Sequence, residues 1–314
     1  MKANRLNVWM ASMATLSVIL FQCNPKTNQD TAMKELKISL AEWSVHKAIK
    51  EDSTLNPDDF PNIAADYGIS AIEWVSQFYK SHGTDASYWN AQRKKCDSIG
   101  LKSVLIMVDD EGDLGSADAS ARKTAVENHY KWIDAAAILG CHSIRLNAFG
   151  DGTKDDMRAA MIESLKQLCL YAAKQSINVI IENHGLYSSD AQWVASVIKG
   201  VDMPNCGTLP DFGNWCTSQK WGSIQVEKKC ETPYDPYQGV SELLPFAKGV
   251  SAKSYGFDAS GNETTIDYSR MIKLVKESNF EGYIGIEFEG NSLTEPEGIK
   301  ATKALIEKTW SELK

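Results

Sequence analysis

Short apolar runs alternate with longer amphipathic stretches along most of this chain. From residue 37 onward, eight of the runs are rich in apolar and β-branched residues and have the length of buried strands. These strand-like runs are Ile38–Trp43, Ala71–Val75, Ser103–Val108, Ser143–Asn147, Asn178–Glu182, Gly207–Asp211, Gly249–Lys253 and Tyr283–Glu287. The spacing leaves room for a helix after each of them.

In the stretch after each run, apolar residues recur with helical spacing. The expected helices are Phe60–Tyr67, Ala86–Ile99, Ala119–Leu139, Asp155–Gln175, Ala191–Ile198, Val240–Phe246, Tyr268–Ser278 and Glu297–Leu313. Glycines at Gly68, Gly100 and Gly140 indicate where three of the helices end before the next strand begins.

The repeated order of strand and helix predicts a single α/β domain over residues 37–314. Eight βα units in about 280 residues match the usual size of a (β/α)8 TIM barrel. The alternative, an open doubly wound sheet, would normally carry a Gly-rich phosphate loop after its first strand. Residues 43–46 read Trp-Ser-Val-His and contain no glycine, so the barrel is favoured.

The first residues of the chain have the pattern of a targeting segment. Lys2 and Arg5 precede an apolar stretch, Leu6–Phe21, which is short for a membrane span. A positive start followed by a short apolar region is typical of a signal peptide, here residues 1–22.

Leu20-Phe21-Gln22-Cys23 resembles the cleavage box of bacterial lipoproteins. Under this interpretation Cys23 becomes the lipidated N-terminus, and the polar residues 24–36 form a flexible tether. The alternative is a plain secretory signal or membrane anchor. Either interpretation places the protein outside the cytoplasm, and the lipoprotein interpretation attaches it to a bacterial membrane in the periplasm or at the cell surface.

Composition and charge narrow the possible partners. The 314 residues are 43% hydrophobic and 24% charged, as in ordinary globular proteins, and the net charge is −8. No cluster of Lys and Arg is present to bind nucleic acid or an anionic membrane. We therefore expect no nucleic-acid partner, and a membrane contact only through the lipid anchor.

Cysteine placement suggests buried thiols and one disulfide candidate. Cys96, Cys141 and Cys169 lie in apolar contexts and are expected to be buried. Three others, Cys206, Cys216 and Cys230, crowd one region, where a Cys216–Cys230 bridge would pin a loop. The sequence leaves the pairing open.

Acidic residues stand at the carboxyl ends of three strand-like runs. Glu182 and Glu287 each follow an apolar run that soon stops at a glycine, and Asp211 ends a third run. In a parallel barrel the carboxyl ends of the strands meet at one mouth. Carboxylates there are costly to bury unless they bind a cation, a base or a donor. Together these acids predict a divalent-cation site or a pair of proton-transferring groups, whereas any one of them alone could form a salt bridge.

Side-chain alternation along each strand predicts which polar residues face the mouth. Besides the three acids, the inward-facing candidates are Arg145, Asn147, His184, Ser251, Lys253 and Glu289. Glu42 and Glu73 end earlier strands and could pair with the inward cations. Of the five histidines, His46 and His184 fall at carboxyl ends, where they could contact a ligand or be structural.

One connection is too long to be a simple turn. Residues 212–238 contain several aromatic residues, including Trp215, Trp221, Tyr234 and Tyr237. Long loops at the carboxyl face usually cover or shape the site. These rings could stack on a sugar or pack the loop onto the barrel, and the sequence leaves both interpretations open.

The strand ends resemble those of the xylose-isomerase-like TIM barrels, a family of sugar isomerases and epimerases, over about residues 37 to 314. The resemblance is carried by the segments Ser39–Trp43, Glu73, Glu182–His184, Asp211–Asn214 and Ile286–Gly290. With its targeting segment, the chain looks like an exported lipoprotein member of this family.

In family members that act on sugars, a Glu, an Asp, a His and a second Glu hold a divalent cation. The resemblance implies metal ligands at Glu182, Asp211 and Glu287, and it places the two glutamates beside the substrate carbon whose proton moves. The histidine of the seventh strand is Ser251 here, whereas the lysine of the same motif is kept as Lys253. An oxygen-only ligand set favours Mg²⁺ or Mn²⁺ over Zn²⁺.

Polar and aromatic residues near these positions are the candidate substrate contacts. They are His184, Lys253, Asn214, Arg145, His46, Trp43, Glu73, Glu289 and Trp215. Asn214 stands where the family often has a histidine, three residues after the sixth-strand Asp.

These features predict a sugar isomerase or epimerase that acts on a non-phosphorylated sugar or sugar derivative. Glu182 would remove a proton next to the carbonyl, a cation would stabilise the enediolate, and Glu287 would return a proton from the other side. The same chemistry could expel a β-substituent, as in a lyase or dehydratase acting on a keto-sugar.

A non-catalytic carbohydrate-binding lipoprotein is the alternative from another class of protein. An abasic-DNA endonuclease of the same superfamily is disfavoured by the five histidines and the acidic balance.

Overall fold

The computed structural model describes residues 1, 34–225 and 228–313. The predicted signal segment, Cys23 and residues 24–33 of the predicted tether lie outside the described residues. Lys34, which the sequence assigned to the tether, donates through Nζ to the Ser278 carbonyl at 2.8 Å. Leu36 packs against the hydrophobic core. Contacts with the barrel therefore begin before residue 37.

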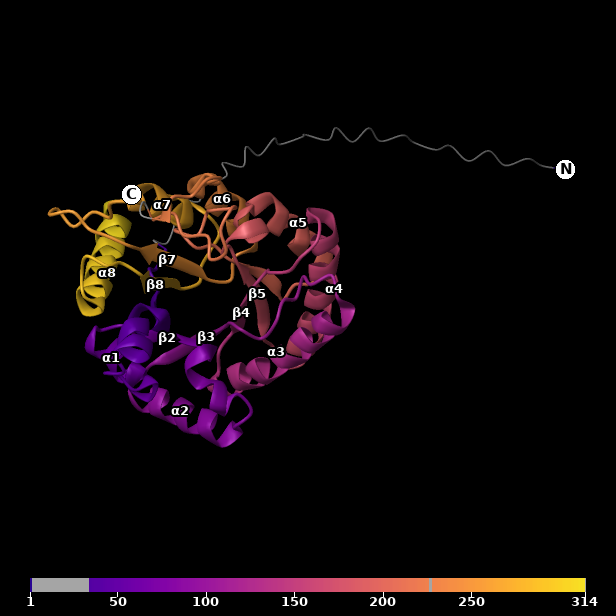
Figure 1. Cartoon of the computed structure of the whole chain (residues 1–314), viewed down its shortest axis with the longest axis horizontal. Helices are drawn as coiled ribbons and strands as arrows, with labels where there is room; N and C mark the ends of the chain where they lie inside the picture. The colour runs from indigo at the N-terminus through magenta and orange to yellow at the C-terminus, as the bar shows by residue number, and fades with distance from the viewer. Residues whose placement is uncertain (2–33, 226–227, 314) are drawn as a thin grey trace. The chain divides into compact units, whose positions relative to one another are not determined.

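Eight parallel strands form one sheet in the order β6-β5-β4-β3-β2-β1-β8-β7 (Figure 1). The strands are β1 (Ile38–Ala41), β2 (Ala71–Val75), β3 (Lys102–Val108), β4 (Ser143–Asn147), β5 (Asn178–Glu182), β6 (Cys206–Leu209), β7 (Val250–Ser254) and β8 (Ile284–Phe288). The predicted (β/α)8 TIM barrel is confirmed.

Isolated backbone contacts between β6 and β7 close the barrel. The Thr208 carbonyl accepts from the Lys248 N–H at 2.9 Å, and the Pro210 carbonyl accepts from the Ser251 N–H at 2.9 Å. Asp211 and Ser251 also form a parallel bridge. Closure at this point brings the end of β6 beside β7, so Asp211 and Ser251 become neighbours.

Helices alternate with the strands and surround them, as Figure 1 shows. They are α1 (Phe60–Asp66), α2 (Ala86–Ser98), α3 (Ala119–Leu139), α4 (Lys154–Ala173), α5 (Ala191–Val201), α6 (Pro236–Leu243), α7 (Tyr268–Glu277) and α8 (Glu295–Glu312). Each of α2 to α8 begins after an Asp or Thr whose side chain accepts a backbone N–H of the first turn. No helix in the described part of the chain is both long and apolar enough to cross a membrane.

The barrel interior is apolar at one end and polar at the other. Leu105, Ile180 and Leu209 belong to a buried cluster inside the barrel, separate from the larger core between sheet and helices. Ile180 and Glu182 share the inward face of β5 because side chains alternate along a strand. The apolar cluster therefore closes the amino-terminal end, and polar side chains occupy the carboxyl-terminal end, where sites of this fold lie.

The first strand is shorter than the sequence predicted. β1 ends before Glu42–Val45, which forms a 3₁₀ turn. Ser44 ties this turn to β8, because its Oγ donates to the Ile286 carbonyl at 3.1 Å and accepts from the Phe288 N–H at 3.0 Å. Trp43 consequently lies on a turn above the barrel instead of on a strand.

Glu42, which could have paired with an inward cation, instead accepts hydrogen bonds from Val75 and Tyr79. Its Oε2 accepts from the Val75 N–H at 2.8 Å and its Oε1 from the Tyr79 hydroxyl at 2.5 Å. Because the strand ends before Glu42, the alternation that would have turned this side chain toward the barrel axis does not apply to it.

Candidate active site

Three carboxyl groups meet at the carboxyl ends of β5, β6 and β8. Glu182 ends β5, Asp211 follows β6, and Glu287 lies near the end of β8. Their ligand oxygens lie within 4.8 Å of one another. Glu182 and Asp211 are fully buried, and Glu287 is 3% exposed. The structure therefore brings together the three residues that the sequence suggested as metal ligands.

Ser251 on β7 lies between two of these acids. Its Oγ is 2.6 Å from Asp211 Oδ2 and 2.7 Å from Glu287 Oε2. A hydroxyl has a single proton, so Ser251 can donate to only one of the two carboxylates. The other short contact requires the proton of a carboxylic acid. This geometry fits a cluster that carries a proton as well as negative charge.

Acidic groups outnumber basic groups around the cluster. The carboxyl groups within it or next to it are Glu73, Asp109, Glu182, Asp211, Glu287 and Glu289. The buried cations that face them are Arg145 and Lys253. Lys253 Nζ is 3.3 Å from Glu287 and 3.4 Å from Glu289. Uncompensated negative charge is costly to bury, so the cluster must bind protons or a cation.

Burial raises the pKa of the acids that end β5 and follow β6 toward or beyond neutrality. It raises the pKa of Glu182 to about 7, against the opposing charge of Arg145. It also raises the pKa of Asp211 well above its usual range, against the opposing charge of Lys253. Both acids therefore hold protons near neutral pH, and a cation that binds to them must displace those protons.

The donor set fits a divalent cation that prefers oxygen ligands. Glu182 Oε2 lies 2.8 Å from Arg145 Nε, but the N–H does not point along this line, so the oxygen has no well-aligned donor among the described residues. An unpaired buried carboxylate oxygen beside two further carboxylates is suited to a cation. Ser251 adds a hydroxyl oxygen beside two of these carboxyl groups.

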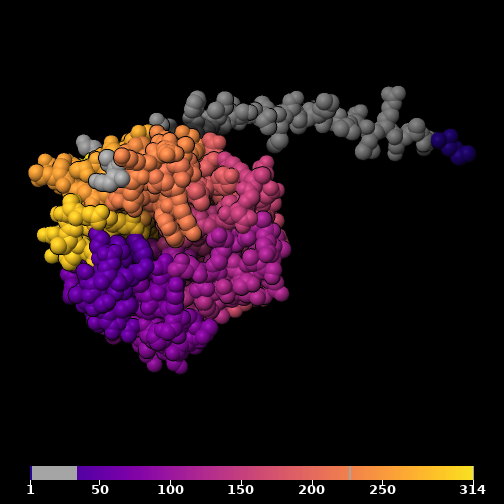
Figure 2. Space-filling model, in the orientation of Figure 1, coloured from indigo at the N-terminus to yellow at the C-terminus, as the bar shows by residue number. Residues whose placement is uncertain are grey.

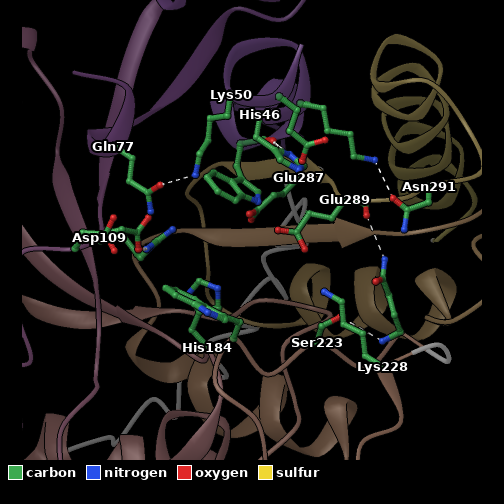
Figure 3. Close-up of a pocket in the computed structure, with 17 residues that line it drawn as sticks. His46, Lys50, Gln77, Asp109, His184, Ser223, Lys228, Glu287, Glu289 and Asn291 are labelled. Carbon is green, nitrogen blue, oxygen red and sulfur yellow. Dashed lines mark hydrogen bonds and ion pairs between the residues drawn. The ribbon is translucent and has the colours of Figure 1, made fainter. Parts of the chain in front are cut away.

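A cavity of about 550 Å³ opens above the acid cluster. Its volume lies within the usual range for small-ligand pockets, roughly 300–1,000 Å³. The strand ends contribute Asp109, Arg145, His184, Glu287 and Glu289 to its wall, and the loops contribute Trp43, Gln77, Trp221, Gln225 and Lys228. Figure 3 shows Asp109 and His184 on one side of the cavity and Glu287 and Glu289 on the other. The site thus combines polar groups at its base with aromatic rings in its walls.

Six residues proposed from the sequence for catalysis or substrate binding line this cavity. They are Trp43, His46, Arg145, His184, Glu287 and Glu289. Glu182 and Asp211 lie beneath it, fully buried. Trp43 and His46 stack with ring centroids 4.7 Å apart, and this pair forms an aromatic part of the wall.

Three other candidates, Lys253, Asn214 and Glu73, are buried and do not line the cavity. Lys253 pairs with Glu287 on β8 and with Glu289 just after it. Asn214 Nδ2 donates to Glu182 Oε1 at 3.2 Å, and Glu73 accepts from Ser39 Oγ at 2.6 Å. Lys253, Asn214 and one oxygen of Glu73 thus have protein partners in this structure, and a substrate contact by these residues stays a prediction.

The aromatic loop gives one tryptophan to the core and another to the cavity. Trp215, proposed as a sugar contact, is fully buried and stacks on Tyr234 at a centroid distance of 5.9 Å. The proposed contact is corrected, because its ring packs the loop onto the barrel. Trp221 is 41% exposed and lies edge-on to His184 at 5.0 Å. The two tryptophans differ in the solvent exposure of their side chains, and the sequence gives no indication of which one is exposed.

A close backbone approach brings Trp221 to the site. Gly185, just after β5, has a φ of 102° and pairs in an antiparallel bridge with Lys220. A Cβ at Gly185 would lie 2.4 Å from the Gln219 carbonyl oxygen. Only glycine therefore allows the loop to pack against the end of β5 and to carry Trp221 over His184.

A disulfide joins the two ends of this cavity-forming segment. Cys216 and Cys230 are bonded, as the sequence suggested, and the chain between them supplies Trp221, Gln225 and Lys228 to the wall. In the space-filling view, the orange segment after β6 extends over the centre of the barrel (Figure 2). The remaining cysteines of the barrel are free and buried, namely Cys96, Cys141, Cys169 and Cys206.

Asp109 is the main site residue that the sequence analysis missed. It directly follows β3, it is 6% exposed, and its Oδ1 accepts from Arg145 Nη1 at 2.9 Å. Asn147 Nδ2 donates to the same oxygen at 2.6 Å, and Asn147 Oδ1 lies 2.6 Å from His184 Nδ1. Asp109 stands at the carboxyl end of a strand, as Glu182 does. The strand-end pattern that pointed to Glu182 therefore also points to Asp109.

Glu73→Gln is expected to flatten the pH dependence of stability. Burial raises the pKa of Glu73 to about 8, mainly because its carboxyl group lies inside the barrel, although Ser39 donates to it. The folded state therefore binds a proton that the unfolded state releases above its ordinary pKa of 4.5. The resulting stability is present at low pH and is lost as the pH rises through about 8.

Urea unfolding at pH 5 and pH 8 measures this effect. Over this interval the free energy of unfolding should fall further in the wild type than in Glu73→Gln, by up to about 4 kcal/mol. Glu127→Gln, an exposed change on α3, serves as the matched control and should follow the wild type. Equal losses in all three proteins would show that Glu73 is ionised throughout.

Comparison with known sequences identifies one matching family. The sequence model of the family described as "Xylose isomerase-like TIM barrel" matches residues 61–309. A search of curated protein sequences found no significant match.

Solved structures with the same architecture include sugar epimerases. The 3-keto-D-glucoside 4-epimerase YcjR from E. coli is 14% identical, with 87% of this chain and 100% of that chain covered at a TM-score of 0.64. D-psicose 3-epimerase from Clostridium cellulolyticum H10, solved with D-tagatose, is 12% identical, with 88% and 96% covered at 0.63. IOLI protein, solved with a zinc atom, is 12% identical, with 88% and 99% covered at 0.64. At these identities the similarity shows the fold.

Proposed function

The chain belongs to the xylose isomerase-like TIM barrel family, and we propose that it is a sugar isomerase or epimerase that moves a proton next to a sugar carbonyl. The observation that carries this proposal is the convergence of Glu182 and Glu287 on one acid cluster beneath a cavity of sugar-binding size. Two carboxyl groups from different strands can approach a substrate carbon from different sides. This is the arrangement that a two-base proton transfer needs.

In the proposed reaction, one glutamate removes a proton from the carbon next to the carbonyl and the other returns one. Glu182 serves as the base, because a pKa of about 7 lets it accept and release protons at neutral pH. Glu287 lines the cavity and returns the proton from the opposite side. Return to the same carbon gives an epimer, and return to the neighbouring carbon gives an isomer.

Glu182, Asp211 and Glu287 would hold a divalent cation, with Ser251 beside them. When bound, the cation supplies positive charge that stabilises the negative oxygen developing beside the deprotonated carbon. Asn214 keeps Glu182 in place by donating to its Oε1, and Lys253 supports Glu287 in the same way. Arg145 sits where it can donate to a sugar oxygen while balancing Asp109 and Glu182.

The walls of the cavity offer aromatic rings and neutral polar groups that suit a sugar, beside charged side chains such as Lys47, Lys50 and Lys228. Trp43 and Trp221 present aromatic rings, which pack well against the C–H faces of sugar rings. Gln77, Ser223 and Gln225 add neutral polar groups that can bind hydroxyl groups. These features support a free sugar or a keto-glycoside as the substrate.

A pair of tryptophan variants tests the assignment of the walls. Trp221→Ala should weaken sugar binding by roughly 3- to 10-fold, the effect of about 1 kcal/mol of ring contact, and should leave the melting temperature nearly unchanged. Trp215→Ala should lower the free energy of unfolding by about 3–5 kcal/mol because it removes a buried ring. Isothermal titration with sugars and thermal melting measure the two effects. The assignment fails if Trp215→Ala alters affinity alone while Trp221→Ala alters stability alone.

We also propose that the protein is exported and anchored by a lipid on Cys23, in the periplasm or at the cell surface. The support is the sequence of residues 1–23. Metabolic labelling with a fatty acid in a bacterial host tests this proposal, with Cys23→Ser as the variant and Cys96→Ser as the control. Label in the wild type and the control but not in Cys23→Ser supports the anchor, and label in none of them contradicts it.

The experiment that tests the function is product analysis after incubation with free ketoses and keto-glycosides. An isomerase or epimerase yields a sugar of unchanged mass with altered NMR signals. Loss of a β-substituent would instead assign the site to a lyase or dehydratase, the alternative that the same proton abstraction allows. Sugar binding without any conversion would support a carbohydrate-binding protein.

A further inference from the structure

Two lysines in the wall of the cavity lack an acidic partner. Lys47 and Lys50 lie on the short helical turn Lys47–Glu51, which comes after the 3₁₀ turn above β1. Neither ammonium group takes part in an ion pair with any residue that the structure describes. Both positive charges are therefore left without a neutralising side chain at the cavity.

Most of the acids in the same wall are already paired with cations of the protein. Five acidic residues line the cavity, and four of them form ion pairs, namely Asp109, Asp110, Glu287 and Glu289. The fifth, Glu51, is exposed and pairs with neither lysine in the described part of the chain. Because these acids are paired and the two lysines are not, the wall carries unpaired positive charge that an anionic ligand can neutralise.

Neutral groups hold both ammonium groups in place without neutralising them. Lys47 Nζ donates to the Gly290 carbonyl at 2.8 Å and to Asn291 Oδ1 at 2.9 Å. Lys50 Nζ donates to Gln77 Oε1 at 3.1 Å. An ammonium group has three N–H donors, so Lys47 has one donor left for a ligand and Lys50 has two. Figure 3 shows Lys50 beside Gln77 at one edge of the cavity and Asn291 at another.

The base of the cavity has the opposite character. Acidic groups outnumber basic groups there, around Glu182 and Asp211. Such a base repels an anionic group of a substrate, whereas unpaired lysines attract it. A substrate with one anionic group therefore binds with that group directed outward and with its uncharged part directed toward the acids.

We infer that the outer part of the cavity binds a carboxylate group of the substrate, and that Lys47 and Lys50 are the residues that recognise it. The substrate is then an acidic sugar, with its carboxylate at the end away from the reacting carbonyl. Lys50 Nζ lies 5.1 Å from the centre of the Trp43 ring, so a sugar that packs on this ring brings a substituent close to Lys50. The choice of a sugar rests on the proposed function, whereas the binding of a carboxylate does not.

The surroundings of the two lysines suit a carboxylate better than a phosphate. Phosphate groups are commonly held by backbone N–H groups at the start of a helix. Here Glu295 already accepts two such groups, from Lys47 at 2.7 Å and from Ala48 at 3.2 Å. With these backbone donors occupied, a ligand must rely on the lysine side chains, which suit the single charge of a carboxylate.

A matched set of sugars tests this inference by isothermal titration, without any need for turnover. The probes are D-glucuronate and D-galacturonate, the neutral parents D-glucose and D-galactose, and the 6-phosphates of both parents. The two acids should bind roughly 3- to 10-fold more tightly than their parents, as is usual for partly exposed ion pairs, and this preference should shrink at high salt. Equal affinity for acids and parents, or no binding of the acids, would overturn the inference. Tighter binding of the 6-phosphates than of the acids would overturn the carboxylate in favour of a phosphate.

Two variants test the role of the lysines. Lys47→Met and Lys50→Met keep the length of the side chain and remove its charge, so each should lower the preference for the acids by roughly 2- to 5-fold and leave the affinity for the neutral parents nearly unchanged. Lys94→Met, an exposed change on α2, is the matched control and should keep the preference of the wild type. If Lys47→Met does not fold, Lys50→Met carries the test, because its side chain is exposed. An unchanged preference in the folded variants would overturn the inference.

The carboxylate site and the proposed function fail in different ways. Conversion of neutral sugars without any preference for acids would overturn the carboxylate site and leave the isomerase or epimerase in place. A preference for acids that depends on the two lysines, with no conversion of any sugar, would overturn the proposed function and leave the carboxylate site in place.

Discussion

Asp211→Asn should reduce the affinity of the protein for Mn²⁺ by roughly 100-fold or more, because changes in groups that merely surround a metal site already cost about 10- to 100-fold. The substitution keeps the size of the side chain and removes its charge from the centre of the acid cluster. Asp211 is bound on both sides, by Ser251 Oγ and by the Gly213 N–H at 2.8 Å. An asparagine can occupy this place, so the fold should persist.

Titration calorimetry with Mn²⁺ and Mg²⁺ measures this loss. Asp155→Asn, an exposed change on α4, is the matched control and should bind as the wild type does. Equal affinity in wild type and Asp211→Asn would remove Asp211 from the site. Binding of no ion by the wild type would leave Glu182 and Glu287 as a metal-free pair.

The same titrations should reveal the protons held by the cluster. Because the pKa values of Glu182 and Asp211 are raised, a cation must displace protons at neutral pH, and affinity should rise as the pH increases from 6 to 8. Repeating the titration in buffers with different ionisation enthalpies counts the protons released. Affinity that does not change over this interval would mean that both acids are ionised before the cation binds.

Glu182→Gln and Glu287→Gln should each lower the rate of sugar conversion by about 10²- to 10⁴-fold, the usual contribution of a general acid or base. In a two-base reaction, each variant loses proton transfer on one side of the carbon and keeps it on the other. Exchange of the substrate proton with solvent should therefore persist with one epimer and not with the other, and the active epimer should differ between the two variants.

Glu127→Gln on α3 is the matched control for this pair and should retain full activity. Full conversion by either active-site variant would remove that glutamate from the mechanism. Loss of exchange with both epimers in one variant, with exchange retained in the other, would indicate that a single glutamate performs both proton transfers.

The sequence predicted the barrel because its pattern is repeated and local. The strand from Ser143 to Asn147 and the helix from Ala119 to Leu139 have the predicted boundaries, since each is bounded by a local signal such as Gly140. β1 was predicted too long, because the contact that ends it, Ser44 with β8, joins residues far apart in the chain.

The acids of the site could be located in advance, but their surroundings could not. Glu182 and Glu287 follow from strand ends, and all parallel strand ends meet at one mouth. Whether Trp215 or Trp221 faces the cavity depends on how the loop crosses Gly185, which is a tertiary contact. Asn214 and Lys253 were assigned to the correct end of the barrel, but packing between strands places them beneath the cavity.

The most direct test of the proposed function is exchange of substrate protons with D₂O, followed by NMR for a panel of free ketoses and keto-glycosides. We expect deuterium at the carbon next to the carbonyl, dependent on Mg²⁺ or Mn²⁺ and lost with EDTA. A protein that binds a sugar from this panel but exchanges none of its protons, with metal present, would contradict it.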